Sequence, residues 1–285
     1  MLWNKARRSH NVQDTREGKD ARTFTGKTLA TGLAGAALAG AALYSTLGTT
    51  PDATITLPAP ATTLSMLTEQ DPQLMFVQSV LGDTEDTWAQ LFNQRDKHYP
   101  PPTLTLFSNG IKSACGFAGA GSGPFYCPDD QQIYLDLAFF RIMAERHGVI
   151  GDFSQAYVLA HEVGHHVQLQ LGLSDPFEQA LSQGRRTSGD GGLEVRAELQ
   201  ADCLAGVWAH HAQQRLDWLE PGDVDAALNA AATFGDDALQ RSANATVRPE
   251  TFNHGTSGQR THWFSAGFSS GTIDTCDTFG TEDLQ

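Results

Sequence analysis

Basic residues are scarce in this 285-residue sequence, and their scarcity limits the partners that it can bind. Lysine and arginine together number 19, against 33 aspartates and glutamates, which gives a formal net charge of −14. Proteins that bind nucleic acid neutralise its phosphates with Lys and Arg side chains. The composition therefore argues against nucleic acid as a partner.

Charge of either sign is absent from residues 28–51, which read TLATGLAGAALAGAALYSTLGTTP. About 20 apolar residues suffice to cross a bilayer as a helix, and basic residues before a span place that end of the chain in the cytoplasm. We predict a cytoplasmic basic head over 1–27, a single-pass transmembrane anchor in the cell membrane over 28–49, and the remainder outside the cytoplasm. A cleaved signal peptide and a soluble helix are the alternatives, but the head is long for a signal peptide.

Cysteines are few, and all four follow that uncharged stretch. An even number of cysteines in an exported domain permits disulfides. Cys115 with Cys127 would close the Gly-rich loop CGFAGAGSGPFYC, which leaves Cys203 to pair with Cys276. We prefer this pairing among the three that are possible, and free buried thiols are the alternative.

The rest of the sequence predicts one α+β domain over 64–285, behind a linker over 50–63 that is rich in Pro and Thr. Strands are predicted at PTLTLF and at QQIYLDL, the second running into a helix. Asp152 as N-cap and Gly172 as stop bound a further helix. Other helices are expected over about 193–216, over about 223–234, and beyond a cap at Ser257.

The helix predicted from Asp152 contains LAHEVGHHVQ. A helix turns 100° per residue, so His161 and His165 lie about 40° apart on one face, whereas His166 lies about 140° from His161. Two imidazoles one turn apart suit zinc, and Glu162 at the edge of that face can reach a water opposite them. We therefore predict His161 and His165 as zinc ligands and Glu162 as general base.

A catalytic zinc needs a third protein ligand and one open position. The next long helix contains EVRAELQAD, which stacks Glu194, Glu198 and Asp202 at intervals of four residues. Like charges at this spacing repel, and a nearby cation relieves the repulsion. We assign Glu198 as the third ligand, with Glu194 as the alternative. Asp202 would orient a ligand histidine through its other ring nitrogen.

HEVGHH followed by ELQAD resembles the glutamate-zincins, the HExxH peptidases whose third ligand is a Glu on a later helix. More closely, the chain resembles the bacterial putative neutral zinc metallopeptidase family. The resemblance runs almost end to end and implies a zincin-like metallopeptidase domain, with a small sheet and several helices, more firmly than it implies any substrate. The segments that carry it are RRSHNVQD, EDTWAQLF, CGFAGAGSGPFYCP, IYLDLAFF, AHEVGHHVQ, ELQADCLAGVWAH, ALNAA, GDDALQ and HGTSGQR.

The predicted reaction is endopeptidase hydrolysis of peptide bonds, in which Glu162 takes a proton from a zinc-activated water and passes it to the departing amine. The anionic intermediate needs another donor, for which we select His254 on its Gly-flanked loop over His262 and Arg260. A purely structural role in holding the C-terminal helix is the alternative for these three. Tyr157 is interpreted as packing. By analogy, the strand IYLDL would pair with an extended peptide or protein substrate.

Two functions of other classes stay open. One is a catalytically silent, zinc-stabilised binding module anchored in the membrane, in which Glu162 would be incidental. The other is a zinc hydrolase of amides outside proteins. The presence of a base at position 162 favours an enzyme over the silent module.

Overall fold

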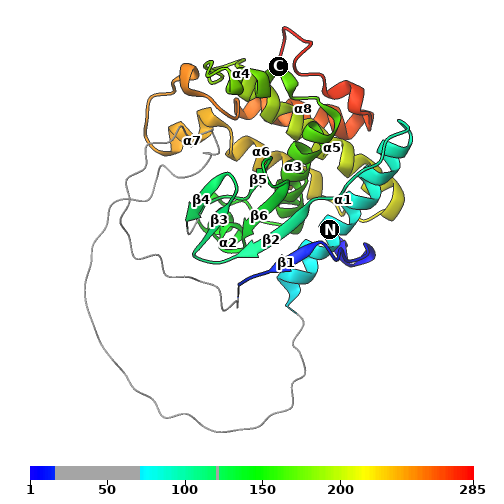
Figure 1. Cartoon of the computed structure of the whole chain (residues 1–285). Coiled ribbons are helices and arrows are strands. Elements are labelled where there is room, and N and C mark those ends of the chain that lie inside the picture. The colour runs from blue at the N-terminus through cyan, green and yellow to red at the C-terminus, as the bar shows by residue number, and fades with distance from the viewer. Residues whose placement is uncertain (17–70, 120–121) are drawn as a thin grey trace, which may run out of the picture.

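The computed structural model describes residues 1–16, 71–119 and 122–285, and its elements form a small sheet beside a body of helices (Figure 1). The expected α+β class is confirmed. The helices are α1 (Pro72–Asn93), α2 (Ala138–His147), α3 (Asp152–Leu171), α4 (Asp175–Ser182), α5 (Leu193–Leu216), α6 (Asp223–Thr233), α7 (Asp236–Ser242) and α8 (Ser257–Ser270). The strands are β1 (Val12–Asp14), β2 (Thr103–Phe107), β3 (Gly110–Ser113), β4 (Gly116–Gly119), β5 (Phe125–Cys127) and β6 (Gln132–Asp136).

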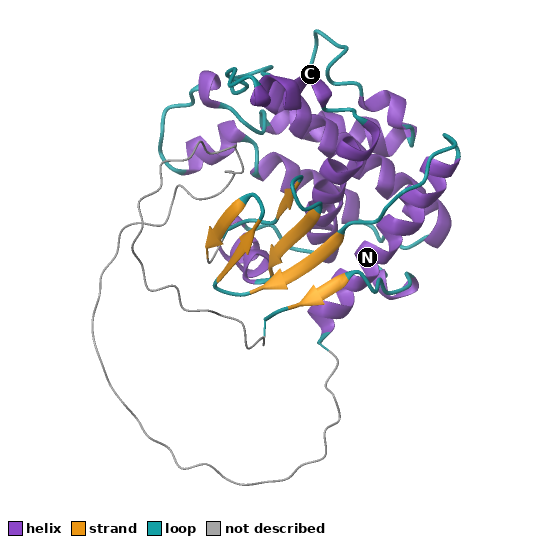
Figure 2. Ribbon diagram, viewed as in Figure 1, coloured by secondary structure: helices purple, strands orange, loops and turns teal. Residues whose placement is uncertain are grey.

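The main sheet has the strand order β1-β2-β6-β5. Its first three strands run parallel, and β5 pairs with β6 in the antiparallel sense. The predicted pairing of a substrate with IYLDL was wrong, because β6 already has a strand on each side. Strands β1 and β5 are the outer strands instead, and β3 and β4 form a separate hairpin in the loop before β5 (Figure 2).

Helices α3, α5 and α8 make the core beside this sheet. Helix α3 ends where predicted, at Gly172 with a φ of 69°, but its N-cap is Gly151, one residue before the predicted Asp152. The N-cap of α8 is likewise one residue early: Thr256, not Ser257, accepts the cap hydrogen bond and forms a capping box with Gln259. Both helices therefore exist as predicted, with caps displaced by one position.

Glycines let α5 and α8 approach until their backbones touch. A Cβ on Gly267 would collide with the carbonyl oxygen of Cys203, and one on Gly206 would collide with that of Phe264. The Cys203–Cys276 disulfide then ties α5 to the chain beyond α8. The second disulfide joins Cys115 to Cys127, so the preferred pairing is confirmed. Two disulfides indicate a domain outside the cytoplasm.

The start of the chain packs against the domain. Strand β1 lies beside β2, and Trp3 contacts the ring of Phe76 on α1 edge-on. The predicted head over 1–27 thus overlaps a segment, 1–16, that belongs to the folded body. The predicted anchor over 28–49 and linker over 50–63 lie outside the described residues. Within the described ranges, no helix has both the length and the apolar character needed to span a bilayer.

Candidate metal centre

Helices α3 and α5 bring His161, His165 and Glu198 together. One ligand atom from each lies within 4.8 Å of the others. The Nε2 atoms of the two histidines are 3.2 Å apart, and Glu198 Oε2 lies 3.1 Å from Nε2 of His161. The three residues that the sequence predicted as ligands thus share one point in space, and that point is reachable from outside because His165 and Glu198 are partly exposed.

A glycine in α3 permits this meeting. Gly164 faces α5, where a Cβ would lie 2.9 Å from the carbonyl oxygen of Ala201. That separation is shorter than real Cβ contacts allow, so a larger residue would push the helices apart. The glycine inside HEVGHH therefore sets how closely Glu198 and Asp202 approach the histidines of α3.

Both histidines are oriented from behind by oxygen acceptors. Nδ1 of His161 lies 2.9 Å from Asp202 Oδ1, and Nδ1 of His165 lies 2.9 Å from Gln168 Oε1. Each Nδ1 therefore directs its proton toward an oxygen, which leaves each Nε2 facing the point that it shares with Glu198. Two imidazole nitrogens and a carboxylate are a donor set of the kind that zinc prefers, so the residues present fit the metal.

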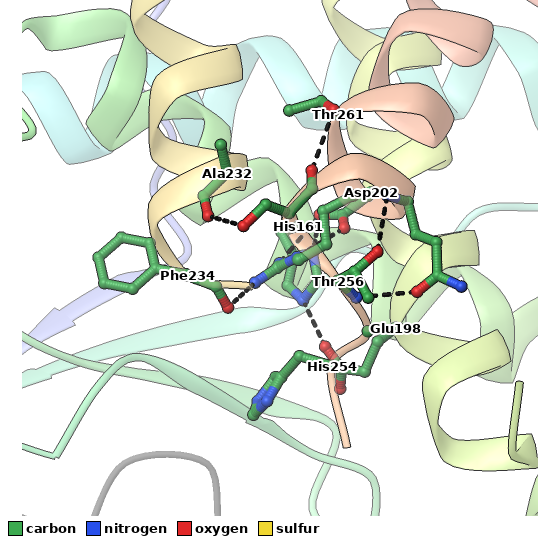
Figure 3. Close-up of polar contacts among 12 residues, drawn as sticks. His161, Glu198, Asp202, Ala232, Phe234, His254, Thr256 and Thr261 are labelled. Atoms are coloured by element: carbon green, nitrogen blue, oxygen red, sulfur yellow. Dashed lines mark hydrogen bonds and ion pairs between the residues drawn. The ribbon is translucent and has the colours of Figure 1, made fainter. Parts of the chain in front are cut away.

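Asp202 is fully buried and is held by three further hydrogen bonds (Figure 3). Tyr157 donates its hydroxyl to Oδ1 at 2.5 Å, and Arg260 donates to both carboxylate oxygens at 2.8 and 3.0 Å. Burial alone would raise the pKa of Asp202, but the charges of Arg260 and His161 lower it to about 2. Asp202 therefore stays ionised behind His161, as its predicted orienting role requires.

The electrostatics of the cluster favour a cation. Burial would lower the pKa of His161, yet Asp202 and Glu198 raise it to about 10. The pKa of Glu198 is held far below its usual range, because the neighbouring histidines outweigh the effect of its burial. Positive charge is therefore stabilised at this point, whether a proton or a metal ion supplies it.

Glu162 lies on the same helix and is 8% exposed. Burial raises its pKa, against the opposing effect of His161, of His165 and of a hydrogen bond with the backbone of Tyr126. Tyr126 belongs to the outer strand β5. Glu162 therefore interacts both with the cluster and with a strand at one edge of the sheet.

His254 lies on the loop before α8, where Asp236 holds it. Its Nδ1 is 3.1 Å from Asp236 Oδ1, while Oδ2 accepts the backbone N–H groups of Asn253, His254 and Gly255 at 2.7–3.0 Å. Burial lowers the pKa of His254, but Asp236 and Glu198 raise it above its usual value. Figure 3 labels His254 on this loop together with Glu198, with which it interacts electrostatically. The sequence patterns do not single out Asp236.

The other candidate residues have hydrogen-bond or packing partners of their own. Arg260 is buried against Asp202, and its Nη2 also donates to the hydroxyl of Tyr157. Tyr157 is therefore a hydrogen-bonding residue in addition to its packing role. His262 is exposed on α8 beside the ring of Trp263. Glu194, the alternative ligand, accepts a hydrogen bond from Thr187.

His166 and Gln168 are two residues whose roles the sequence does not reveal. The sequence predicts an ordinary polar helix residue at His166, yet this side chain is 1% exposed, with Nδ1 against the hydroxyl of Tyr126 and Nε2 against the carbonyl oxygen of Pro100. Gln168 follows His165 by three positions, and this helical spacing is the signal that places it on the face of that ligand.

Comparison with known proteins places this geometry in a family. The description "putative neutral zinc metallopeptidase" belongs to the family whose profile matches residues 1–279. The uncharacterized protein YpfJ of Escherichia coli (strain K12) is 46% identical over 218 residues, which cover 76% of this chain and 75% of that protein. The uncharacterized protein Rv2575 of Mycobacterium tuberculosis (strain H37Rv) is 42% identical over 196 residues, 65% of each chain. No solved structure matches. Because the profile spans both helices of the cluster, the chain belongs to the putative neutral zinc metallopeptidase family.

Proposed function

We propose that this protein is a zinc-dependent endopeptidase that acts outside the cytoplasm. The observation that carries the proposal is the buried carboxylate of Glu162 beside the ligand atoms of His161, His165 and Glu198. When bound by these three residues, zinc supplies a Lewis acid that lowers the pKa of a water and polarises a carbonyl group.

Glu162 acts as the general base and then as the general acid. It takes a proton from the attacking water and delivers it to the amine that leaves. Its raised pKa suits both steps, because a carboxyl group whose pKa lies closer to neutrality accepts and returns a proton more readily. A binding module without catalysis would gain nothing from burying a carboxylate at this position.

His254 donates a hydrogen bond to the substrate oxygen that becomes negatively charged. Asp236 occupies its Nδ1, so Nε2 is the nitrogen that is free to reach the substrate. The raised pKa of His254 favours the form in which Nε2 carries a proton. A donor of this kind stabilises the transition state more than the ground state.

Strand β5 provides the edge along which an extended peptide binds. It is one of the two outer strands of the main sheet, opposite β1, and no described strand pairs with its other edge. Tyr126 on this strand meets Glu162, so a peptide added to β5 would pass beside the general base. This arrangement favours a peptide over an amide without a long extended chain.

Cleavage of an unfolded protein such as casein tests the proposal. The full chain is used because residues 1–16 contribute a strand to the sheet. We expect cleavage that a zinc chelator abolishes, that Glu162→Gln abolishes while zinc stays bound, and that the exposed Glu145→Gln leaves intact. Cleavage that survives Glu162→Gln would contradict the mechanism. A folded, zinc-loaded protein that cleaves no polypeptide would favour the silent module or a hydrolase of other amides.

A further inference from the structure

Residues 1–16 are held against the folded domain by polar contacts with helix α1. Ser9 is 1% exposed, and its hydroxyl donates to Glu85 Oε1 at 2.6 Å. The side chain of Asn11 donates to the same oxygen at 2.8 Å, and Arg7 reaches the other oxygen of Glu85 at 2.7 Å. Glu85 lies on α1 and is 7% exposed. A carboxylate buried there depends on these three donors for its hydrogen bonds.

The backbone of the same segment completes the sheet. Val12–Asp14 pairs with Leu104–Leu106, and the N–H and hydroxyl of Thr15 both donate to the carbonyl oxygen of Leu106. Gly82 on α1 makes room for this approach, because a Cβ there would collide with the carbonyl oxygen of Arg7. The surface of α1 and β2 is therefore shaped to receive this segment of the chain.

Arg16 and Asp71, the described residues on either side of positions 17–70, are also in contact. Arg16 Nη2 lies 2.6 Å from Asp71 Oδ2, and the same guanidinium binds Asp14. Asp71 is in turn the N-cap of α1, where it accepts from the backbone of Gln73 and Leu74. The two described residues that flank positions 17–70 thus lie side by side on the domain (Figure 1).

We infer that residues 1–16 and the metal centre lie in the same compartment. A single crossing of a membrane between positions 16 and 71 would separate Arg16 from Asp71 by a hydrocarbon layer of about 30 Å. The ion pair between them and the pairing of β1 with β2 exclude that separation. The predicted cytoplasmic head with an exported domain is incompatible with this fold.

Thiol labelling in cells tests the inference with the full chain. All four native cysteines are in disulfides, so an introduced cysteine is the one reactive thiol. His10→Cys reports on the start of the chain and Phe117→Cys on the domain; both positions are exposed, Phe117 by 76%. Each variant is treated with a membrane-impermeant maleimide, before and after the membrane is permeabilised.

We expect the two variants to behave alike. Either both react in intact spheroplasts, or both react only once the membrane has been permeabilised. The inference would be overturned if one variant reacts in intact spheroplasts and the other reacts only once the membrane has been permeabilised.

A second measurement checks whether residues 1–16 dock on the domain. Ser9→Ala removes a buried hydrogen bond and should lower the Tm of the purified protein by about 2–4 °C, whereas the exposed Asn4→Ala should not. An unchanged Tm for Ser9→Ala would also overturn it. Neither result depends on peptidase activity.

Discussion

Asp202 Oδ1 lies 2.9 Å from Nδ1 of His161 and fixes which nitrogen of that ring faces the metal centre. A carboxylate at this distance accepts a hydrogen bond from Nδ1, so Nε2 faces the point that it shares with His165 and Glu198. The same carboxylate is held by Arg260 and Tyr157. Arg260 of α8 thus holds Asp202 of α5, and Asp202 in turn orients the candidate ligand His161 of α3.

Asp202→Asn should weaken zinc binding by about 10- to 100-fold, because the ligand loses the acceptor that orients it. Competition with a chromophoric chelator measures the affinity. Asp83→Asn is the matched control, since Asp83 is also buried and binds an arginine, Arg215, and an aromatic donor, Trp208, away from the cluster. Both variants lose stability, and a similar zinc affinity in both would contradict the role of Asp202.

Gly164→Ala should reduce both stability and zinc affinity. The added methyl group meets the backbone of Ala201 and forces α3 away from α5, which carries Glu198. Overpacking of this kind costs about 1–3 kcal/mol. Gly258→Ala serves as control, because the space around Gly258 is open apart from Thr256 Oγ1 at 3.9 Å. Urea denaturation and chelator competition on both variants check the prediction, which fails if Gly164→Ala binds zinc as tightly as Gly258→Ala.

Helical periodicity in the amino-acid sequence is enough to predict which side chains of each helix face the candidate metal centre. His161 and His165 sit on one helix, and Glu198 and Asp202 on another, so their spacing reports local geometry. The contact between the two helices is the one feature that requires tertiary information. The stacked acids of the second helix indicate it indirectly, because their mutual repulsion predicts a cation nearby. The sequence patterns are informative wherever the chemistry depends on neighbours within one element.

Contacts between distant segments cannot be predicted in this way. Asp236 meets His254 because its own N–H binds the carbonyl oxygen of Gly255, a contact across 19 residues. Strand β5 has three residues, too few for an alternating pattern, and the analogy assigned the substrate instead to the longer β6, which is an inner strand. The basic residues Arg7 and Arg16 suggested an orientation signal for a membrane anchor, whereas they form ion pairs with acids of α1 and of its N-cap.

His254→Ala should lower kcat by about 100- to 1,000-fold, the usual effect of removing a donor to a developing negative charge. KM and zinc affinity should change little, because His254 is not one of the three ligands. Asp236→Asn should give a smaller loss of kcat, since the imidazole stays but its orientation is less fixed. The exposed His262→Ala is the control. Equal kcat values for His254→Ala and His262→Ala would assign His254 a structural role.

The two disulfides should differ in what they contribute to stability. Cys203 and Cys276 are 73 positions apart, whereas Cys115 and Cys127 are 12 apart. The entropy that a crosslink removes from the unfolded chain grows with loop length, which predicts about 4 kcal/mol for the first disulfide and about 3 kcal/mol for the second. Urea denaturation of the two Cys→Ser double variants measures both values. A larger loss for the short loop would contradict this order.

His166 should make the protein less stable in mild acid. Burial lowers the pKa of His166 below its usual value of 6.5, so the unfolded chain takes up a proton at pH values where the folded chain does not. The stabilisation is complete above pH 6.5 and is lost as the pH falls toward the folded pKa. Over that window the free energy of unfolding should fall by up to about 1.4 kcal/mol per pH unit.

Urea denaturation of the zinc-loaded protein between pH 7.5 and 5 measures this slope. His166→Gln should be less stable at pH 7.5 but should lose less stability on acidification than the wild type. Tyr126→Phe is the matched control, because it removes the hydroxyl next to Nδ1 and keeps the titrating ring. It should cost about 1 kcal/mol at pH 7.5, and stability should still fall on acidification because the buried ring still titrates. Parallel profiles for wild type and His166→Gln would mean that the folded protein accepts a proton at His166 as easily as the unfolded chain.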